Sequence, residues 1–227
     1  MPSIGFAGIG QTPDTATVSA ICAFLPASVN VVEAGCLDGL TRADIDALGP
    51  NPDEVGIACD LHDGSSILLS HSKLLPRMQD CVDELSGERN ADLIVILCGA
   101  DWSSITSSTL VVNPGRVFPS VISSLSYGRK LGVIKPSAGQ IADETARYQG
   151  MGIDVHVTAA SPFCGAERFD LVREAATDLR DVSCDLIWMT CVSMDSEMKQ
   201  IVSDITRKPV ILANELLAKI ISTTLPA

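Results

Sequence analysis

Two cysteines differ from the other six in the residues that surround them. Cys98 ends the apolar run Leu93–Cys98, and Cys191 ends the apolar run Leu186–Cys191. Small or polar residues follow each run, and we expect a helix to begin shortly afterwards. Unpaired backbone N–H groups and the positive end of a helix dipole favour a thiolate at such a junction. The placement therefore predicts two thiols that can exchange protons with a substrate.

The remaining cysteines have no special setting, and we interpret them as small buried apolar residues. They are Cys22, Cys36, Cys59, Cys81, Cys164 and Cys184. No CxxC pair occurs, and the CDLH sequence that ends at His62 has no second Cys/His pair, so we expect no metal site. In GIGQTP, Pro13 occupies the place of the third glycine of a dinucleotide fingerprint. Phosphate-binding lysine loops and serine nucleophile elbows are also missing, so we expect no cofactor.

The surrounding pattern alternates short apolar runs with amphipathic stretches, which is typical of β-α units and a parallel sheet. The expected strands are Ile4–Ile9, Val29–Ala34, Val55–Cys59, Leu93–Cys98, Leu131–Lys135, Ile153–Val157, Leu186–Cys191 and Val210–Leu212. The expected helices are Asp14–Phe24, Ser72–Leu85, Pro119–Tyr127, Gly139–Tyr148, Glu167–Leu179, Ser196–Ile205 and Glu215–Thr223. The fold class is α/β.

The chain contains a second regularity, because its two halves have similar segments. IGFAGIGQTP and LGVIKPSAGQ are each a short strand that opens into a turn, and each half has one strand that ends in a cysteine. We expect two pseudo-symmetric halves, residues 1–114 and 115–208, each a mostly parallel sheet flanked by helices. A C-terminal helical segment, 209–227, is expected to pack on the first half. Ligands of such sheets bind at the carboxyl ends of the strands.

Two thiols in matching places suit the inversion of a carbon that carries an acidic hydrogen. That reaction needs a base on one face of the carbon and an acid on the other. One thiol must be ionised while the other is protonated, so their titrations would be coupled. Backbone amides near the thiols can also hold a substrate carboxylate.

Eight segments in order resemble the AroM family: IGQTP, AGCLDGLTRADI, DLHDG, SHSKLLPRMQ, GVIKPSAGQ, ASPF, LIWMTCVSMD and KPVILANELLAKI. The resemblance runs from about Ile9 to Ile220. It implies membership of the Asp/Glu/hydantoin racemase-like superfamily, with flavodoxin-like halves and an active site in the cleft between them. It also implies one catalytic cysteine from each half, matching Cys98 and Cys191.

The residues beside the two cysteines depart from the racemase pattern. The first cysteine of those enzymes is usually followed by Asn-Thr, and the second usually stands in Gly-Cys-Thr. Here Gly99 and Ala100 follow the first cysteine, and Val192 and Ser193 follow the second. Free glutamate or aspartate is therefore not the expected substrate. The expected substrate is instead a small carboxylate or a cyclic amide.

Turn residues near the expected strand ends complete the candidate substrate-binding set. Gln11 and Thr12 follow the first strand, and Pro136 and Ser137 follow its counterpart. Capping of a helix is an equal alternative for Thr12 and applies to Ser137 as well. Asp60 is assigned to a lip of the site, whereas Asp63 and Gly64 are better explained by a plain turn.

The amino-acid composition limits the classes of partner that the protein is expected to bind. Sixteen basic and 28 acidic residues give a formal net charge of −12, which disfavours nucleic acid and anionic membrane surfaces. No apolar run approaches the length of a membrane helix, and the N-terminus lacks the pattern of a signal peptide, so we expect a cytoplasmic protein. Association of identical subunits is left open.

Three functions remain open at this stage. The leading hypothesis is a cofactor-independent racemase, epimerase or isomerase. The second is a decarboxylase or other lyase in which Cys191 donates a proton. The third is a binding or regulatory protein without turnover, because a fold does not fix a function.

Overall fold

The computed structural model describes residues 1–225, and its chain divides into two compact units. The first unit comprises residues 1–117 and the chain from Leu217 onward, and the second comprises Phe118–Leu216. The last two positions of the expected C-terminal segment, 226 and 227, lie outside the described residues. No helix within the described chain is both long enough and apolar enough to cross a membrane.

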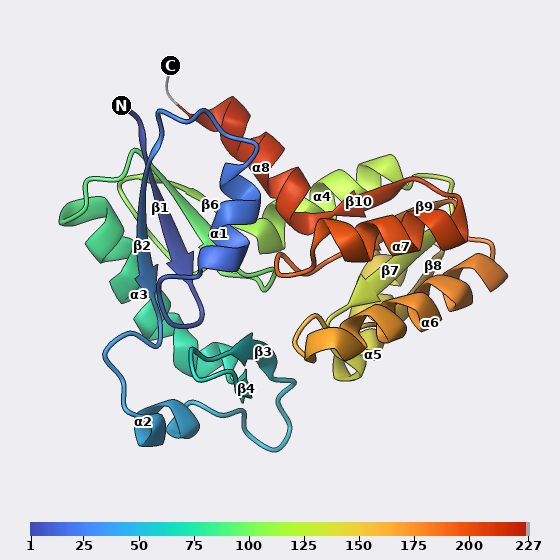
Figure 1. Cartoon of the computed structure of the whole chain (residues 1–227), viewed down its shortest axis with the longest axis horizontal. Coiled ribbons are helices and arrows are strands. Elements are labelled where there is room, and N and C mark those ends of the chain that lie inside the picture. The colour runs from blue at the N-terminus through green and yellow to red at the C-terminus, as the bar shows by residue number, and fades with distance from the viewer. Residues whose placement is uncertain (226–227) are drawn as a thin grey trace. The chain divides into compact units, whose positions relative to one another are not determined.

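The first unit is built on a four-stranded sheet in the order β2-β1-β5-β6 (Figure 1). Its strands are β1 (Ser3–Gly8), β2 (Asn30–Gly35), β5 (Leu93–Leu97) and β6 (Leu110–Val112), and every pairing is parallel. All residues of β1 and β5 are buried, as expected for central strands covered on both faces. The carboxyl ends of all four strands therefore lie at one edge of the sheet.

Helix α3 (His71–Gly87) packs against β1, β2 and β5 of this sheet. Its buried residues recur with helical spacing, from Leu74 and Met78 through Val82 to Leu85. The helix lies close to the sheet because β1 carries a glycine at position 5. A Cβ at that position would lie 3.1 Å from two side-chain carbons of Leu85. The shorter helix α1 (Thr15–Cys22) follows β1, and Asp14 caps it by accepting a hydrogen bond from the Thr17 N–H.

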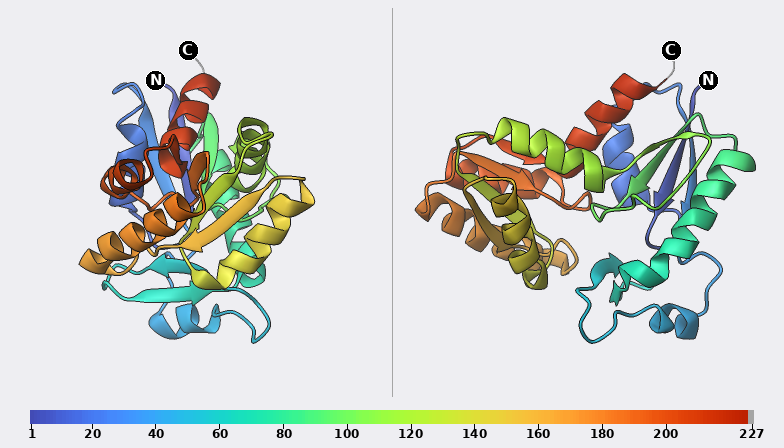
Figure 2. Two further views of the ribbon diagram at one scale, coloured as in Figure 1. Left: turned by 90° about the vertical axis from the view of Figure 1, so that its right-hand side faces the viewer. Right: turned by 180° about the vertical axis from the view of Figure 1, so that it is seen from behind.

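An insertion separates β2 from α3 in the first unit. It contains helix α2 (Arg42–Ala47) and the antiparallel hairpin β3 (Ile57–Asp60) and β4 (Ser66–Leu69). Figures 1 and 2 show this insertion beyond the carboxyl ends of β1 and β2. The strand expected at Val55–Cys59 thus belongs to a separate two-stranded sheet, not to the parallel sheet.

The second unit repeats the sheet with the order β10-β9-β7-β8. Its strands are β7 (Leu131–Lys135), β8 (Val155–Ala159), β9 (Leu186–Met189) and β10 (Val210–Leu212), all parallel. Helix α5 (Ile141–Gly150) and helix α6 (Arg168–Asp181) pack against β8, and α7 (Ser196–Thr206) lies beside α6 and contacts β10 (Figure 2). Short 3₁₀ turns occupy Ala138–Gln140 and Gly165–Glu167.

Two helices run across the division between the units, α4 (Pro114–Leu125) and α8 (Ala213–Thr224). Each unit has its own buried apolar cluster, in which the residues of one unit pack on one another.

The two sheets have the same connectivity. Read from the second strand of each unit, the orders are β2-β1-β5-β6 and β8-β7-β9-β10. The first strand of each unit is central, and its neighbours are the second and third parallel strands. This confirms the predicted α/β fold with two similar halves, each a parallel sheet flanked by helices.

Candidate active-site residues at the strand ends

Cys98 directly follows β5, the third parallel strand of the first unit. It is 6% exposed, and the Ala100 N–H donates a hydrogen bond to its Sγ over 3.5 Å. Gly99 and Ala100 form a bend at the carboxyl edge of the sheet. An amide that donates to sulfur stabilises the ionised thiol, whereas burial has the opposite effect.

The helix expected after Cys98 is absent. The chain between Leu97 and Leu110 forms only turns, bends and irregular structure. Asp101 instead accepts hydrogen bonds from the N–H and the hydroxyl of Ser103. These bonds, led by that of the hydroxyl, hold the pKa of Asp101 below its usual value. The prediction of a helix dipole at Cys98 was therefore wrong, and local amides are the donors there.

Helix α4 approaches this loop through a glycine. A Cβ at Gly115 would lie 2.0 Å from the Ala100 carbonyl oxygen, so no side chain fits between the helix start and the loop. Trp102 anchors the same loop from the other direction. It is 1% exposed, and its ring centroid lies 4.5 Å from that of His71.

Two further thiols lie near Cys98, in the cluster of buried apolar residues of the first unit. A hydrogen bond with Cys81, burial and the neighbouring thiols Cys81 and Cys98 raise the pKa of Cys36, while Arg77 opposes the rise. Arg77 donates from Nε to the Cys36 carbonyl oxygen and from Nη2 to that of Asp38, the latter over 3.3 Å. The sequence separated these thiols by tens of residues and gave no sign of their proximity.

Gln11 and Thr12 lie in the loop after β1, and both form hydrogen bonds with other residues of the protein. The Gln11 Oε1 accepts a hydrogen bond from the His62 N–H over 2.9 Å, which joins this loop to the hairpin. Thr12 donates from its backbone N–H and its hydroxyl to the carboxylate of Asp38, over 2.7 and 2.5 Å. The Gly35 N–H donates to the same carboxylate over 2.9 Å. Asp38 therefore holds the ends of β1 and β2 together, a role that the sequence analysis missed.

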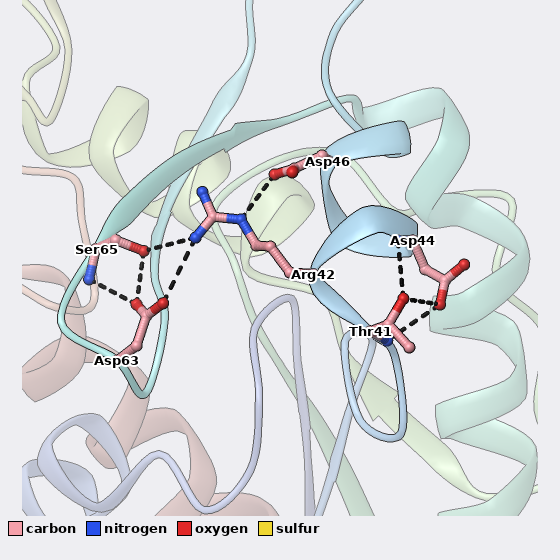
Figure 3. A network of polar contacts seen from close by, with 6 residues as sticks. All are labelled: Thr41, Arg42, Asp44, Asp46, Asp63 and Ser65. Carbon is pink, nitrogen blue, oxygen red and sulfur yellow. Dashed lines mark hydrogen bonds and ion pairs between the residues drawn. The ribbon is translucent and has the colours of Figure 1, made fainter.

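Asp60 and Asp63 lie in the hairpin, where their carboxylates are already bonded. Asp60 accepts a hydrogen bond from Ser66 Oγ over 2.5 Å. Asp63 accepts from the N–H and the hydroxyl of Ser65, and Arg42 of α2 reaches the pair (Figure 3). Gly64 has a φ of +83°, which a glycine adopts without strain. These contacts fit the turn expected at Asp63 and Gly64.

Figure 3 also shows how this hairpin is fixed to α2. Arg42 donates from Nε to Asp46 over 2.8 Å and from Nη1 to Ser65 Oγ over 3.2 Å. Thr41 and Asp44 form a capping box at the start of α2. All of these groups are exposed, so water screens each pair and its contribution to stability is small.

Cys191 occupies the place in the second unit that Cys98 occupies in the first. It lies two residues after β9 and is half-buried. Burial raises the pKa of Cys191, and hydrogen bonds from the backbone and side chain of Ser193, the charge of Lys135 and the backbone of Met194 oppose that rise. Helix α7 begins five residues later, capped by Asp195. The prediction of a turn and a helix start after Cys191 is confirmed.

Pro136 and Ser137 follow β7, the strand beside β9. Ser137 makes no side-chain capping bond, so capping does not account for it. The Oε1 of Gln140, at the end of this turn, is buried and has no hydrogen-bond partner within the described residues. In this unit Pro136, Ser137, Val192 and Ser193 all follow adjacent strands at one sheet edge.

The fold and these strand ends define a class of protein. In solved structures, the chain is similar to the glutamate racemase from Francisella tularensis subsp. tularensis SCHU S4 in complex with D-glutamate (TM-score 0.61, 14% identity, 98% of this chain and 80% of that one). It is also similar to allantoin racemase from Pseudomonas fluorescens (0.62, 15%, 97% and 89%). A third similar structure is unliganded arylmalonate decarboxylase (0.57, 12%, 99% and 94%). The protein therefore has the fold of the Asp/Glu/hydantoin racemase-like proteins.

The sequence identifies the family within that class. The profile described as "AroM protein" matches residues 4–225, nearly the whole chain, so the protein belongs to the AroM family. No curated protein matches the chain in sequence.

Proposed function

We propose that this AroM-family protein is a cofactor-independent racemase, epimerase or isomerase of a small carboxylate or cyclic amide. The observation that carries the proposal is the matching position of Cys98 and Cys191. Each follows the third parallel strand of its unit, next to the turn after the first strand. Packing alone gives no reason for the same residue type at the same place in both units.

In the proposed reaction the two thiols act on opposite faces of one carbon. The thiolate removes the acidic hydrogen as a proton, and the bonding electron pair remains on the substrate as an enolate. The other thiol then returns its own proton to the opposite face, so the two cysteines exchange protonation states and nothing is oxidised. The N–H groups of Ala100 and Ser193, which donate to the sulfur atoms of Cys98 and Cys191, are candidates for holding the substrate carboxylate.

The expected protonation of Cys191 supports a starting role as the acid. Because burial raises the pKa of Cys191, its neutral thiol predominates at neutral pH. In the direction in which Cys191 is the acid, Cys98 is the base. The reverse direction requires Cys191 to ionise.

The test is deuterium incorporation from D₂O, followed by proton NMR. The panel comprises amino acids, hydantoins, hydroxy acids, malonates and unsaturated diacids, with the wild type, Cys98→Ser and Cys191→Ser. Exchange at a stereocentre that is lost or restricted to one enantiomer in either variant would support the two-thiol reaction. Full exchange in both variants would contradict it.

A second measurement tests whether the two thiols reach the same molecule. A bifunctional bimane emits fully only after both of its arms have reacted with thiols. The wild type should form a Cys98–Cys191 crosslink that peptide mapping identifies, and each single variant should not. Crosslinks confined to other cysteine pairs would count against a shared substrate.

A lyase is the second candidate, and the burial of Cys191 favours it. Decarboxylation leaves an enolate that needs one proton donor, and a thiol with a raised pKa is such a donor. The likeness to arylmalonate decarboxylase points the same way at the level of the fold. Substitution of Cys98 distinguishes a racemase from a decarboxylase, because Cys98→Ser should abolish racemisation and spare decarboxylation.

The same cysteines also separate an enzyme from a non-catalytic binder. A catalytic thiol in a cytoplasmic protein should react with iodoacetamide near neutral pH faster than structural thiols. Cys22 and Cys164 are the matched controls because they too are half-buried. If neither Cys98 nor Cys191 reacts faster than these two, the binding function becomes the better proposal.

A further inference from the structure

Lys135 places a positive charge beside the strand end that carries Cys191. It is the last residue of β7, and the register pairs Ile134 of β7 with Met189 of β9. The next residue of the β9 segment, Thr190, donates from both its N–H and its hydroxyl to the Ile134 carbonyl oxygen, over 3.1 and 3.2 Å. Lys135 is therefore level with Thr190, the residue immediately before Cys191.

The side chain of Lys135 is largely buried and is held by a carboxylate. It is 16% exposed, and its Nζ lies 3.4 Å from Glu144 Oε2 of α5. The Glu144 side chain is itself 10% exposed, and Arg147 Nη1 lies 3.8 Å from the same oxygen. A single carboxylate thus faces two cations.

Other charged groups near this strand end are paired with each other. Asp195 caps α7 by accepting from the Met198 N–H, and Arg168 of α6 lies 3.4 Å from its second oxygen. The positive charge of Lys135 acts on Cys191 in the sense that favours the ionised sulfur.

We propose that Lys135 is a positioning residue that stabilises the thiolate form of Cys191, with Glu144 holding its ammonium group in place. The inference rests on the proposed function, because only proton transfer in both directions requires Cys191 to ionise. Burial by itself favours the neutral thiol, so a base role for Cys191 needs opposing interactions, of which the hydrogen bonds from Ser193 are the larger. Lys135 adds a positive charge to them, one residue level away along the neighbouring strand.

The experiment measures the rate of Cys191 alkylation by iodoacetamide against pH, with peptide mapping by mass spectrometry. It requires no substrate. In Lys135→Met the midpoint of the profile should rise by about one pH unit. The rate at pH 7.5 should fall by about threefold, because the smaller thiolate fraction is partly offset by the greater nucleophilicity of a more basic thiolate.

Two matched variants control for charge and for folding. Lys135→Arg keeps the charge and should keep the wild-type midpoint. Lys130→Met removes a lysine whose charge acts on Cys184, and it should leave the Cys191 profile unchanged. Cys184 is 1% exposed, so its protection from iodoacetamide in Lys135→Met would show that the unit remains folded.

An unchanged Cys191 midpoint in Lys135→Met would overturn the inference, as would an equal shift in Lys130→Met. These results are independent of turnover. A shifted midpoint without deuterium exchange would support Lys135 and count against the proposed function, whereas exchange with an unshifted midpoint would do the reverse.

Discussion

The carboxyl edges of the two sheets carry the same residue type in different electrostatic surroundings. At the edge of the first unit, Cys98 lies among apolar residues and other thiols, and Arg77 is bound to backbone carbonyl oxygens. At the edge of the second unit, Cys191 lies near Lys135, which is paired with the buried Glu144. The repeat preserves the position of the thiol and changes what surrounds it.

This difference suggests that the two thiols have unequal roles. A thiol near an ammonium group can be ionised or protonated with little change in its surroundings. At Cys98, the N–H of Ala100 donates to the sulfur and so stabilises its charged form. We therefore expect kcat and KM to differ between the two directions of a racemisation, while kcat/KM stays equal because the enantiomers have equal free energies.

The largest test of the comparison is the replacement of each cysteine by serine. Either Cys98→Ser or Cys191→Ser should lower deuterium exchange by roughly 10³-fold, because a hydroxyl is a far weaker acid than a thiol. Proton NMR in D₂O measures the effect, and Cys184→Ser is the control in the second unit. Loss in Cys191→Ser alone would indicate a lyase and break the equivalence of the two edges.

The charged edge should also be the one that depends on a buried carboxylate for stability. Glu144→Ala leaves Lys135 and Arg147 without their shared partner and should lower the free energy of unfolding by about 2 kcal/mol, less than for a fully enclosed pair. Urea unfolding followed by circular dichroism gives the value. The control is Asp181→Ala, which removes an exposed partner of Arg180 and should cost less than about 0.5 kcal/mol. Equal losses would mean that Glu144 has no special role.

At the first edge, the corresponding carboxylate belongs to Asp38 and binds neutral donors. Asp38→Asn replaces charge-assisted bonds to Thr12 and Gly35 with weaker ones and should cost about 1 kcal/mol in urea unfolding. Asp46→Asn, at an exposed pair with Arg42, is the matched control. A loss as large as that of Glu144→Ala would remove the contrast between the two edges.

The last effect concerns a thiol away from both edges. Burial raises the pKa of Cys184 from 9.0 to about 11, so its neutral form stabilises the fold below pH 9 and this contribution is lost as the pH rises towards 11. The wild type should therefore lose about 1 kcal/mol relative to Cys184→Ala between pH 8 and pH 10. Urea unfolding of both proteins at the two pH values measures it. A constant difference would mean that Cys184 titrates alike in the folded and unfolded chain.

The sequence predicted seven of the eight strands of the two parallel sheets, because they are short and apolar, whereas β6 (Leu110–Val112), only three residues long, was missed. Leu131–Lys135 and Val210–Leu212 have the expected bounds, and Cys98 and Cys191 lie at or just beyond strand ends. The hairpin strand Ser66–Leu69 was missed because it is four residues long and partly exposed. Its partner consequently appeared to belong to the parallel sheet.

The candidate site was predictable only where one residue type marked a strand end. The helix expected after Cys98 is absent, because the residues that follow turn towards Ser103 and Trp102 instead. Asp38 and Lys135 could not be found from spacing. Their roles depend on strands and turns that become neighbours only in the folded sheet, such as the loop of Thr12 beside β2 and the end of β7 beside β9.

The fluorescence of the two tryptophans can report the unfolding of each unit separately. Trp102 belongs to the first unit and contacts His71, whereas Trp188 belongs to β9 of the second unit and packs edge-on against Phe118. Both are at most 2% exposed, so the emission of each should move to longer wavelength when its own unit unfolds. Trp102→Phe and Trp188→Phe would leave one emitter apiece. Coincident denaturation curves from the two variants would mean that the halves melt as one cooperative body, and separated curves would assign a stability to each.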